Sequence, residues 1–149
     1  MQIKIIYENK KQFIDLLLLA DEQEYMIDTY LERGTMFVLY EKDCAKSICV
    51  VTEEKEGFCE IKNMATYPHC QRKGYGKKLL NYIFDYYSKK YTTIFVGTGE
   101  SPLTIPFYES CGFKISHRIK NFFVDNYDHI IIEEGIQLVD MIYLKKDLI

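Results

Sequence analysis

Apolar residues recur along the chain with two periods, one typical of helices and one typical of strands. Helical spacing covers residues 10–20, 22–33 and 77–87. The last of these stretches carries an apolar stripe formed by Leu79, Leu80, Ile83, Phe84 and Tyr87. Runs rich in β-branched and aromatic residues predict strands over 2–7, 35–40, 45–52, 58–66, 92–97 and 137–146.

One more helix is expected between the strand 92–97 and Gly112. Ser101 and Pro102 resemble a helix cap followed by a first-turn proline, but Pro106 would then clash with the carbonyl four residues before it. We therefore expect either a kink or a helix that begins near Ile105.

The predicted elements follow the order β-α-α-β-β-β-α-β-α-β, without an internal repeat or a Pro- or Gly-rich linker. We therefore expect a single domain of the α/β (α+β) class over residues 1–149. The helix 77–87 connects the strands 58–66 and 92–97, and a crossover of this kind makes its two strands parallel. The sheet is therefore expected to be mixed.

The composition is that of a chain able to bury a core, since 48% of its 149 residues are apolar and 15% are aromatic. No apolar run approaches the roughly 18 residues that a membrane span needs. The first residues alternate like a strand and do not resemble a signal peptide, so we expect the cytoplasm. The five cysteines include no Cys-x-x-Cys pair, which favours buried free thiols over a metal site.

The segment Gln71-Arg72-Lys73-Gly74-Tyr75-Gly76 lies between the strand 58–66 and the helix 77–87. A glycine-spaced turn at a helix start presents unpaired backbone N–H groups and the positive end of the helix dipole. The segment also begins a basic cluster, although the net charge of the chain is −3: Arg72, Lys73, Lys77 and Lys78. These features predict a site for a phosphate-bearing ligand. One basic loop on an acidic chain does not favour nucleic acid.

Two common phosphate-binding motifs do not fit this segment. A Walker loop requires Gly-x4-Gly-Lys-Ser/Thr, and Gly76-Lys77-Lys78 lacks both the earlier glycine and the hydroxyl. A Rossmann fingerprint requires a third glycine three residues after the second, where this chain has Leu79.

The segment instead resembles the pyrophosphate-binding motif of the GNAT superfamily of acetyl-CoA-dependent N-acetyltransferases. The element order is similar to that of the family over about residues 2–146, and the most specific part of the resemblance is 57–113. The resemblance implies a GNAT fold, with a mixed central sheet of six to seven strands, flanking helices and a splayed pair of parallel strands. It implies acetyl-CoA as cosubstrate, no metal, and a possible homodimer.

The resemblance also places the pantetheine arm of acetyl-CoA between the splayed strands. It implies that the backbone of Met64, Ala65 and Thr66 contacts pantetheine, and that the Met64 N–H can polarise the thioester carbonyl. The pyrophosphate would then bind the loop formed by Gln71, Arg72, Lys73, Gly74, Tyr75, Gly76 and Lys77.

Acetylation of an alkyl amine requires that the protonated amine first lose a proton. Such an amine has a pKa near 10.4, so its protonation at pH 7 is a handicap of roughly 4 to 5 kcal/mol unless a base assists. Glu60 resembles the catalytic glutamate of histone-type members in its spacing before Gly74, and strand alternation predicts that it shares a face with Met64. The alternative is that Glu60 pairs with a lysine of a neighbouring strand.

The leaving thiolate also needs a proton. The family places a tyrosine four residues before a Gly-Phe pair, as a general acid next to the sulfur, and Tyr108 stands at this position before Gly112. The alternative is that Tyr108 is one more core aromatic among 13 tyrosines.

Two segments expected on the acceptor side are acidic. They carry Asp21, Glu22, Glu24, Asp28 and Glu32, and Asp125, Asp128, Glu133, Glu134 and Asp140. Their charges are either solvated or concentrate a cationic substrate. With the resemblance, the second interpretation predicts acetyl transfer to a primary amine of a small cationic metabolite by direct attack in a ternary complex. A peptide or protein N-acetyltransferase, and a non-catalytic acetyl-CoA-binding module, stay open as alternatives.

Overall fold

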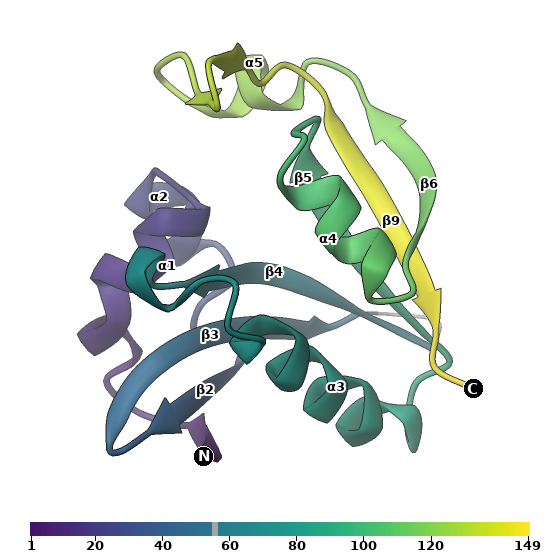
Figure 1. Cartoon of the computed structure of the whole chain (residues 1–149). Coiled ribbons are helices and arrows are strands. Elements are labelled where there is room, and N and C mark those ends of the chain that lie inside the picture. The colour runs from purple at the N-terminus through teal and green to yellow at the C-terminus, as the bar shows by residue number, and fades with distance from the viewer. Residues whose placement is uncertain (55–56) are drawn as a thin grey trace.

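The computed structural model of the chain describes residues 1–54 and 57–149. Its central feature is a seven-stranded mixed sheet with the strand order β1-β2-β3-β4-β5-β9-β6 (Figure 1). The strands are β1 (Gln2–Ile6), β2 (Thr35–Glu41), β3 (Cys44–Glu53), β4 (Phe58–Thr66), β5 (Thr93–Gly99), β6 (Lys114–Ile119) and β9 (Met141–Asp147). The mixed sheet confirms the expected fold class.

Helices cover both faces of the sheet (Figure 1). They are η1 (Lys10–Phe13), α1 (Ile14–Ala20), α2 (Glu24–Asp28), η2 (Pro68–Cys70), α3 (Tyr75–Ser88), α4 (Thr104–Ser110) and α5 (Phe122–Asn126). The apolar stripe of α3 packs with α4 around one core cluster, as its spacing predicts, while α1 and α2 pack around a second cluster.

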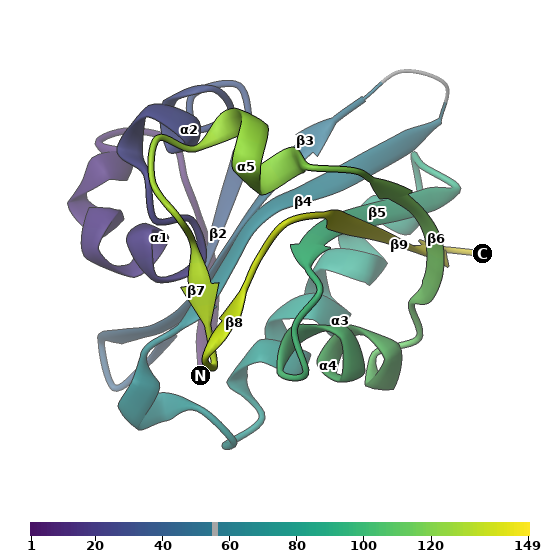
Figure 2. The ribbon, with the colours of Figure 1, turned by 90° about the horizontal axis from the view of Figure 1, so that it is seen from above.

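Residues 121–140, which we call the capping segment, connect β6 to β9 at the top of Figure 1 and pass over α1 and α2 in the view of Figure 2; Tyr127 and Asp128 of this segment form hydrogen bonds with Asp21 and Gln23. The segment contains α5 and a small hairpin of β7 (Ile132–Glu133) and β8 (Ile136–Gln137). It has its own small core, formed by Phe123, Ile131 and Leu138. The capping segment is thus a separate layer that faces α1 and α2.

β4 and β5 are parallel and separate toward their C-terminal ends. Their register runs from Phe58 opposite Thr93 to Ile61 opposite Val96, although both strands continue beyond this point. The crossover through α3 and the splayed strand pair are thereby confirmed. The divergence is what leaves room for a ligand between the two strands.

A β-bulge interrupts the alternation of β4. Between Ile61 and Asn63 this strand advances by two residues while β3 advances by one, so Lys62 is the extra residue. The two faces of β4 therefore exchange at the bulge, and Ile61 and Met64 both pack into the core cluster beside α3. The expectation that Glu60 shares a face with Met64 is wrong for this reason.

Some element boundaries differ from the sequence-based ones. The second helix ends at Asp28 and is followed by turns, and the last predicted strand is divided between β8 and β9. β6 was not predicted, because every one of its residues is exposed and its sequence lacks an apolar face. α4 begins at Thr104, so Pro106 lies in its first turn, where no intrahelical N–H is needed.

Candidate functional site

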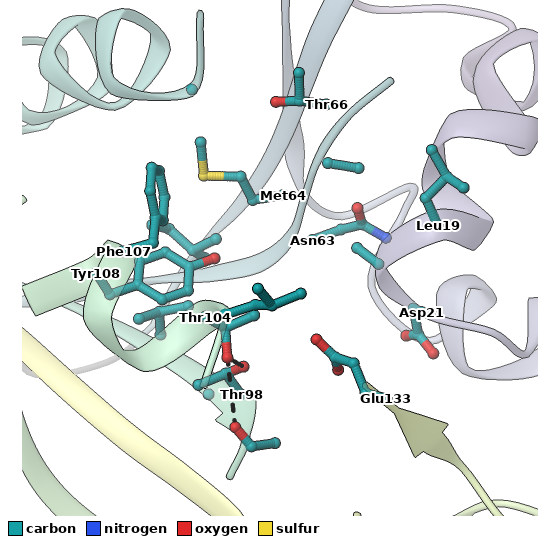
Figure 3. A pocket seen from close by; sticks show the side chains of 18 of the residues that line it. Leu19, Asp21, Asn63, Met64, Thr66, Thr98, Thr104, Phe107, Tyr108 and Glu133 are labelled. Carbon is teal, nitrogen blue, oxygen red and sulfur yellow. Dashed lines mark hydrogen bonds between the residues drawn. The ribbon is translucent and has the colours of Figure 1, made fainter. Parts of the chain in front are cut away.

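The divergence of β4 and β5 opens a cavity of about 790 Å³. It is lined by β4, the loop before α3, the end of β5, α4, the α1–α2 connection and the capping segment (Figure 3). Ten of the residues predicted from the sequence line it: Met64, Ala65, Thr66, Gln71, Arg72, Gly74, Tyr75, Gly76, Lys77 and Tyr108. Lys73 and Glu60 do not line this cavity.

The loop before α3 presents a run of unpaired backbone donors. Among the described residues, no backbone carbonyl or side chain accepts a hydrogen bond from the N–H groups of Arg72 to Lys77, and the first helical bond runs from the Lys78 N–H to the Gly74 carbonyl at 3.1 Å. All of these residues except Lys73 line the cavity, at the positive end of the 14-residue helix α3. The loop is therefore suited to bind an anion such as a pyrophosphate.

Two glycines shape this loop for different reasons. Gly74 has a φ of +84°, a conformation that strains any residue with a side chain, although no atom lies within 4 Å of where a Cβ would stand. At Gly76 a Cβ would lie 3.3 Å from side-chain carbons of Met64 and of Phe107. Gly74 is thus required by the backbone angle, and Gly76 by the close approach of β4 and α4.

The C-terminal half of β4 has an open edge on the cavity side. Met64, Ala65 and Thr66 pair with β3 on one side, but past Ile61 the register with β5 has ended. The carbonyl of Thr66 accepts a hydrogen bond of 3.2 Å from the side-chain amide of Gln71. An open strand edge can pair with an extended ligand in the way that it pairs with another strand.

Tyr108 projects from α4 into the cavity (Figure 3). Its ring is only 7% exposed and packs edge-on against Phe113, with ring centroids 5.5 Å apart. Its hydroxyl forms no hydrogen bond with any residue in the described part of the chain. Burial raises the pKa of this phenol, and the nearby Cys49, Cys111 and Glu133 add to the rise. The phenol therefore keeps its proton at neutral pH.

Glu60 lies on β4, does not line the cavity, and has 9% of its surface exposed. Its Oε2 forms an ion pair of 2.8 Å with Nζ of Lys62 and accepts a hydrogen bond of 2.9 Å from the hydroxyl of Tyr143 in β9. The lysine that pairs with Glu60 thus belongs to the same strand and not to a neighbouring one. The other carboxylate oxygen has no partner among the described residues.

A chain of hydrogen bonds that the sequence analysis did not predict joins β4 to the capping segment. Asn63 donates to the hydroxyl of Tyr30 at 3.0 Å, and this hydroxyl donates to Asp21 at 3.0 Å. The hydroxyl of Tyr127 donates to the other oxygen of Asp21 at 2.7 Å. Asn63, Asp21 and Tyr127 all line the cavity. A polar asparagine within an apolar strand, next to Met64, was the available signal in the sequence.

Only part of the negative charge predicted for the acceptor side lies at the cavity. Of the acidic residues in the two segments, Asp21, Glu22 and Glu133 line it. Several others form ion pairs elsewhere, namely Glu24 and Asp28 with Lys11, and Asp140 with Arg118. The cavity is therefore lined by Arg72 and Lys77 of the loop before α3 and by Lys62 of β4, and by carboxylates of the α1–α2 connection and the capping segment.

Within residues 1–54 and 57–149, no three His, Cys, Asp or Glu side chains are grouped so that they could hold a metal ion. No helix in this part of the chain has the length and apolar character required to cross a bilayer. Cys49, Cys59 and Cys70 are buried free thiols, as expected, whereas Cys44 is exposed and Cys111 is half-buried.

Comparison with known proteins identifies the fold and the cosubstrate. The family model described as "Acetyltransferase (GNAT) domain" matches residues 32–115. The uncharacterized N-acetyltransferase YvbK of Bacillus subtilis (strain 168) is 35% identical over 99% of this chain and 97% of its own length.

Two solved structures are similar over almost the whole chain. A Bacillus subtilis acetyltransferase in complex with CoA is 35% identical, with a TM-score of 0.91 and 99% coverage of both chains. A GNAT family acetyltransferase from Elizabethkingia anophelis with acetyl-CoA bound is 33% identical, with a TM-score of 0.92 over 98% of this chain and 97% of its own. The chain therefore belongs to the GNAT family of acetyltransferases, and it is an N-acetyltransferase that uses acetyl-CoA.

Proposed function

We propose that this enzyme acetylates a primary amine of a small cationic metabolite by direct attack on acetyl-CoA in a ternary complex. The observation that carries this proposal is the distribution of charge around a single cavity. The loop with the free backbone donors contributes Arg72 and Lys77 to the lining, and the α1–α2 connection and the capping segment contribute Asp21, Glu22 and Glu133. The loop suits the diphosphate of the cosubstrate, and the carboxylates attract a cationic acceptor.

In this proposal the loop from Gln71 to Lys77 binds the diphosphate through its backbone N–H groups. Lys73 does not line the cavity, so its part in this site depends on its unpaired N–H within the same loop. The open edge formed by Met64, Ala65 and Thr66 pairs with the pantetheine arm, and the Met64 N–H donates to the thioester oxygen, where negative charge develops during attack.

We assign Tyr108 the role of general acid toward the leaving thiolate. Support for this role comes from a phenol that points into the cavity, keeps its proton and has no protein acceptor among the described residues. A thiol has a pKa near 8.5, so its thiolate leaves more readily than an alkoxide and needs only modest assistance. The contribution of Tyr108 is therefore expected to be moderate.

Glu60 stays a candidate for the base that removes a proton from the amine. Its free Oε1 could accept a proton through an intervening water, while Lys62 and Tyr143 both bind Oε2. Direct contact between Glu60 and the acceptor is not part of the proposal, because the carboxylate lies outside the cavity lining.

The acceptor class can be tested by measuring CoA thiol release with acetyl-CoA and a panel of amines. We expect turnover with spermidine, putrescine or kanamycin, and much slower turnover with neutral amines. Turnover restricted to neutral or anionic amines would contradict the cationic class, and turnover restricted to peptides would favour the peptide N-acetyltransferase. Tight CoA binding without thiol release from any amine would favour a non-catalytic module.

Two further proposals concern the compartment in which the enzyme works and its oligomeric state. Five free cysteines suit a reducing compartment, so we propose that the enzyme works in the cytoplasm. We also propose a homodimer, for which the support is the exposed β6 at the outer edge of the sheet. Light scattering coupled to size-exclusion chromatography tests the second proposal, and a monomer at all concentrations would contradict it.

A further inference from the structure

Glu133 is a carboxylate of the cavity that the sequence did not single out from its acidic neighbours. It lies in β7 of the capping segment, is half-buried, and lines the cavity. Its side chain points from β7 into the cavity, toward the space between Tyr108 and Asp21 (Figure 3). The adjacent Glu134 is exposed and does not line the cavity.

A buried serine holds this carboxylate in place. The hydroxyl of Ser101, a residue that is only 3% exposed, donates to Oε1 of Glu133 at 3.2 Å. The same hydroxyl oxygen accepts the N–H of Leu103 at 3.1 Å, which directs the hydroxyl proton toward Glu133. Oε2 of Glu133 has no hydrogen bond or ion pair with any described residue. One oxygen is thus fixed, and the other is available to a ligand.

The other carboxylates near the acceptor end differ from Glu133 in their hydrogen bonds, their exposure or their position relative to the cavity. Asp21 already accepts two hydroxyl groups, one on each oxygen, from Tyr30 and Tyr127. Glu22 is exposed to solvent. Glu60 is bound by a lysine and a tyrosine and lies outside the cavity lining.

Glu133 and Tyr108 also influence each other electrostatically. Burial is the main cause of the raised pKa of the Tyr108 phenol, and the charge of Glu133 is among the smaller causes. An acceptor nitrogen between these two side chains would therefore lie near both a carboxylate and a phenol, which are the two groups that the proton transfers require.

We propose that Glu133 is a catalytic residue that binds the acceptor ammonium through Oε2 and takes one of its protons. The proposal rests on the proposed function, since it requires an amine acceptor. The freed nitrogen forms a C–N bond with the thioester carbon, the C–S bond breaks, and the thiolate takes the proton of the Tyr108 phenol. Glu133 passes its proton to solvent, and the second proton lost by the nitrogen restores the phenol.

The test compares Glu133→Gln with the matched control Glu134→Gln, which removes an exposed carboxylate from the same hairpin. Rates are measured from pH 6 to pH 9 with the fastest of spermidine, putrescine and kanamycin. We expect Glu133→Gln to lower kcat about 100-fold at pH 7, with KM for acetyl-CoA unchanged. The loss should shrink as the pH approaches the pKa of the amine, because solution then supplies the free base. Glu134→Gln should stay within twofold of wild type.

Three results would overturn this inference. The first is a kcat of Glu133→Gln within threefold of wild type. The second is an increase of only the KM for the acceptor in Glu133→Gln, with the pH profile of kcat unchanged. The third is a loss of kcat in Glu60→Gln that Glu133→Gln does not share. Glu133→Asp keeps a carboxylate and should recover part of kcat, which a merely structural role would not predict. If wild type releases no thiol with any cationic amine, the substrate class fails; if wild type is active and Glu133→Gln is too, only Glu133 fails.

Discussion

The hydroxyl of Tyr127 donates a hydrogen bond of 2.7 Å to the carboxylate of Asp21, and these residues are 106 positions apart in the chain. Tyr127 belongs to the capping segment, and Asp21 belongs to the connection between α1 and α2. Their contact joins two segments that both line the cavity. Asp21 accepts two tyrosine hydroxyls, and much of its surface is removed from water. The stability of the fold should therefore depend on whether this carboxyl is protonated.

The first prediction is a pH dependence of stability that originates at Asp21. Burial raises the pKa of its carboxyl above the ordinary value of 3.8, and the hydrogen bonds from Tyr127 and Tyr30 oppose the rise only in part. The folded protein therefore holds this proton where the unfolded chain has released it. Stability from this group is fully present below pH 3.8 and is lost as the pH rises through the folded pKa.

Asp21→Asn cannot titrate and should lack this loss. In urea unfolding from pH 3.5 to pH 7.5, the free energy of unfolding of the variant should increase relative to wild type as the pH rises through this window, then level off. Glu22→Gln removes the exposed neighbouring carboxylate and controls for a general effect of charge. If the free energies of unfolding of Asp21→Asn and wild type differ by the same amount at every pH, the pKa of Asp21 is not raised.

The second prediction concerns the backbone of the loop before α3. Gly74→Ala places a Cβ at a φ of +84°, which costs about 1 to 2 kcal/mol if the loop keeps its shape. If the loop instead relaxes, its N–H groups turn away from the diphosphate. Calorimetric titration with CoA should therefore show a Kd roughly 10-fold higher.

Gly57→Ala is the matched control, because Gly57 has a φ of +82° and does not line the cavity. It should lower stability by a similar amount and leave the Kd for CoA unchanged. Equal affinities of wild type and Gly74→Ala would mean that this loop does not bind the cosubstrate.

The third prediction is the effect of removing the phenol of Tyr108. Tyr108→Phe keeps the ring that packs against Phe113, so the melting temperature and the Kd for CoA should stay near those of wild type. We expect kcat to fall roughly 10- to 100-fold at pH 7, with a smaller loss above pH 8.5, where the leaving thiolate no longer requires a proton.

Tyr87→Phe is the control for Tyr108→Phe, since Tyr87 of α3 is also buried in the core but does not line the cavity. A steady-state assay of thiol release measures both variants. If Tyr108→Phe turns over as fast as Tyr87→Phe, the tyrosine of α4 is a core aromatic and not the general acid.

The sequence predicted those parts of the fold and site that depend on local pattern. The stripe of α3 and the glycine-hinged loop before it are set by residues within one stretch, and the structure places them as expected. β6 and β7 were missed, and β8 was not separated from β9, because an exposed edge strand and two-residue strands carry no apolar period.

The site residues that were missed depend on contacts between distant parts of the chain. Strand alternation wrongly predicted that Glu60 shares a face of β4 with Met64. The β-bulge at Lys62 that separates them is fixed by pairing with β3 and has no signature in the sequence of β4 itself. The proximity of Glu133 to Tyr108 requires the capping segment to fold over the cavity, and no local spacing encodes that arrangement.

The last prediction decides what Glu60 does. Its Oε2 accepts the hydroxyl of Tyr143 at 2.9 Å, and burial together with the charge of Glu60 raises the pKa of this phenol. A double-mutant cycle of Glu60→Gln and Tyr143→Phe should give a coupling energy of about 1 to 2 kcal/mol in urea unfolding. A coupling near zero would mean that the hydrogen bond contributes nothing to stability.

The same variants divide a structural role from a catalytic one. If the pair only connects β4 to β9, each variant loses stability while kcat changes by less than about threefold, within the scatter expected for indirect effects. If Glu60 is instead the base that acts through a water, Glu60→Gln should lower kcat about 100-fold. Tyr143→Phe should then alter the pH profile as well, because it releases the carboxylate that Tyr143 had oriented. Glu60 and Glu133 cannot both be the principal base. A large loss of kcat in only one of Glu60→Gln and Glu133→Gln therefore assigns the proton transfer either to Glu60 in β4 or to Glu133 in β7.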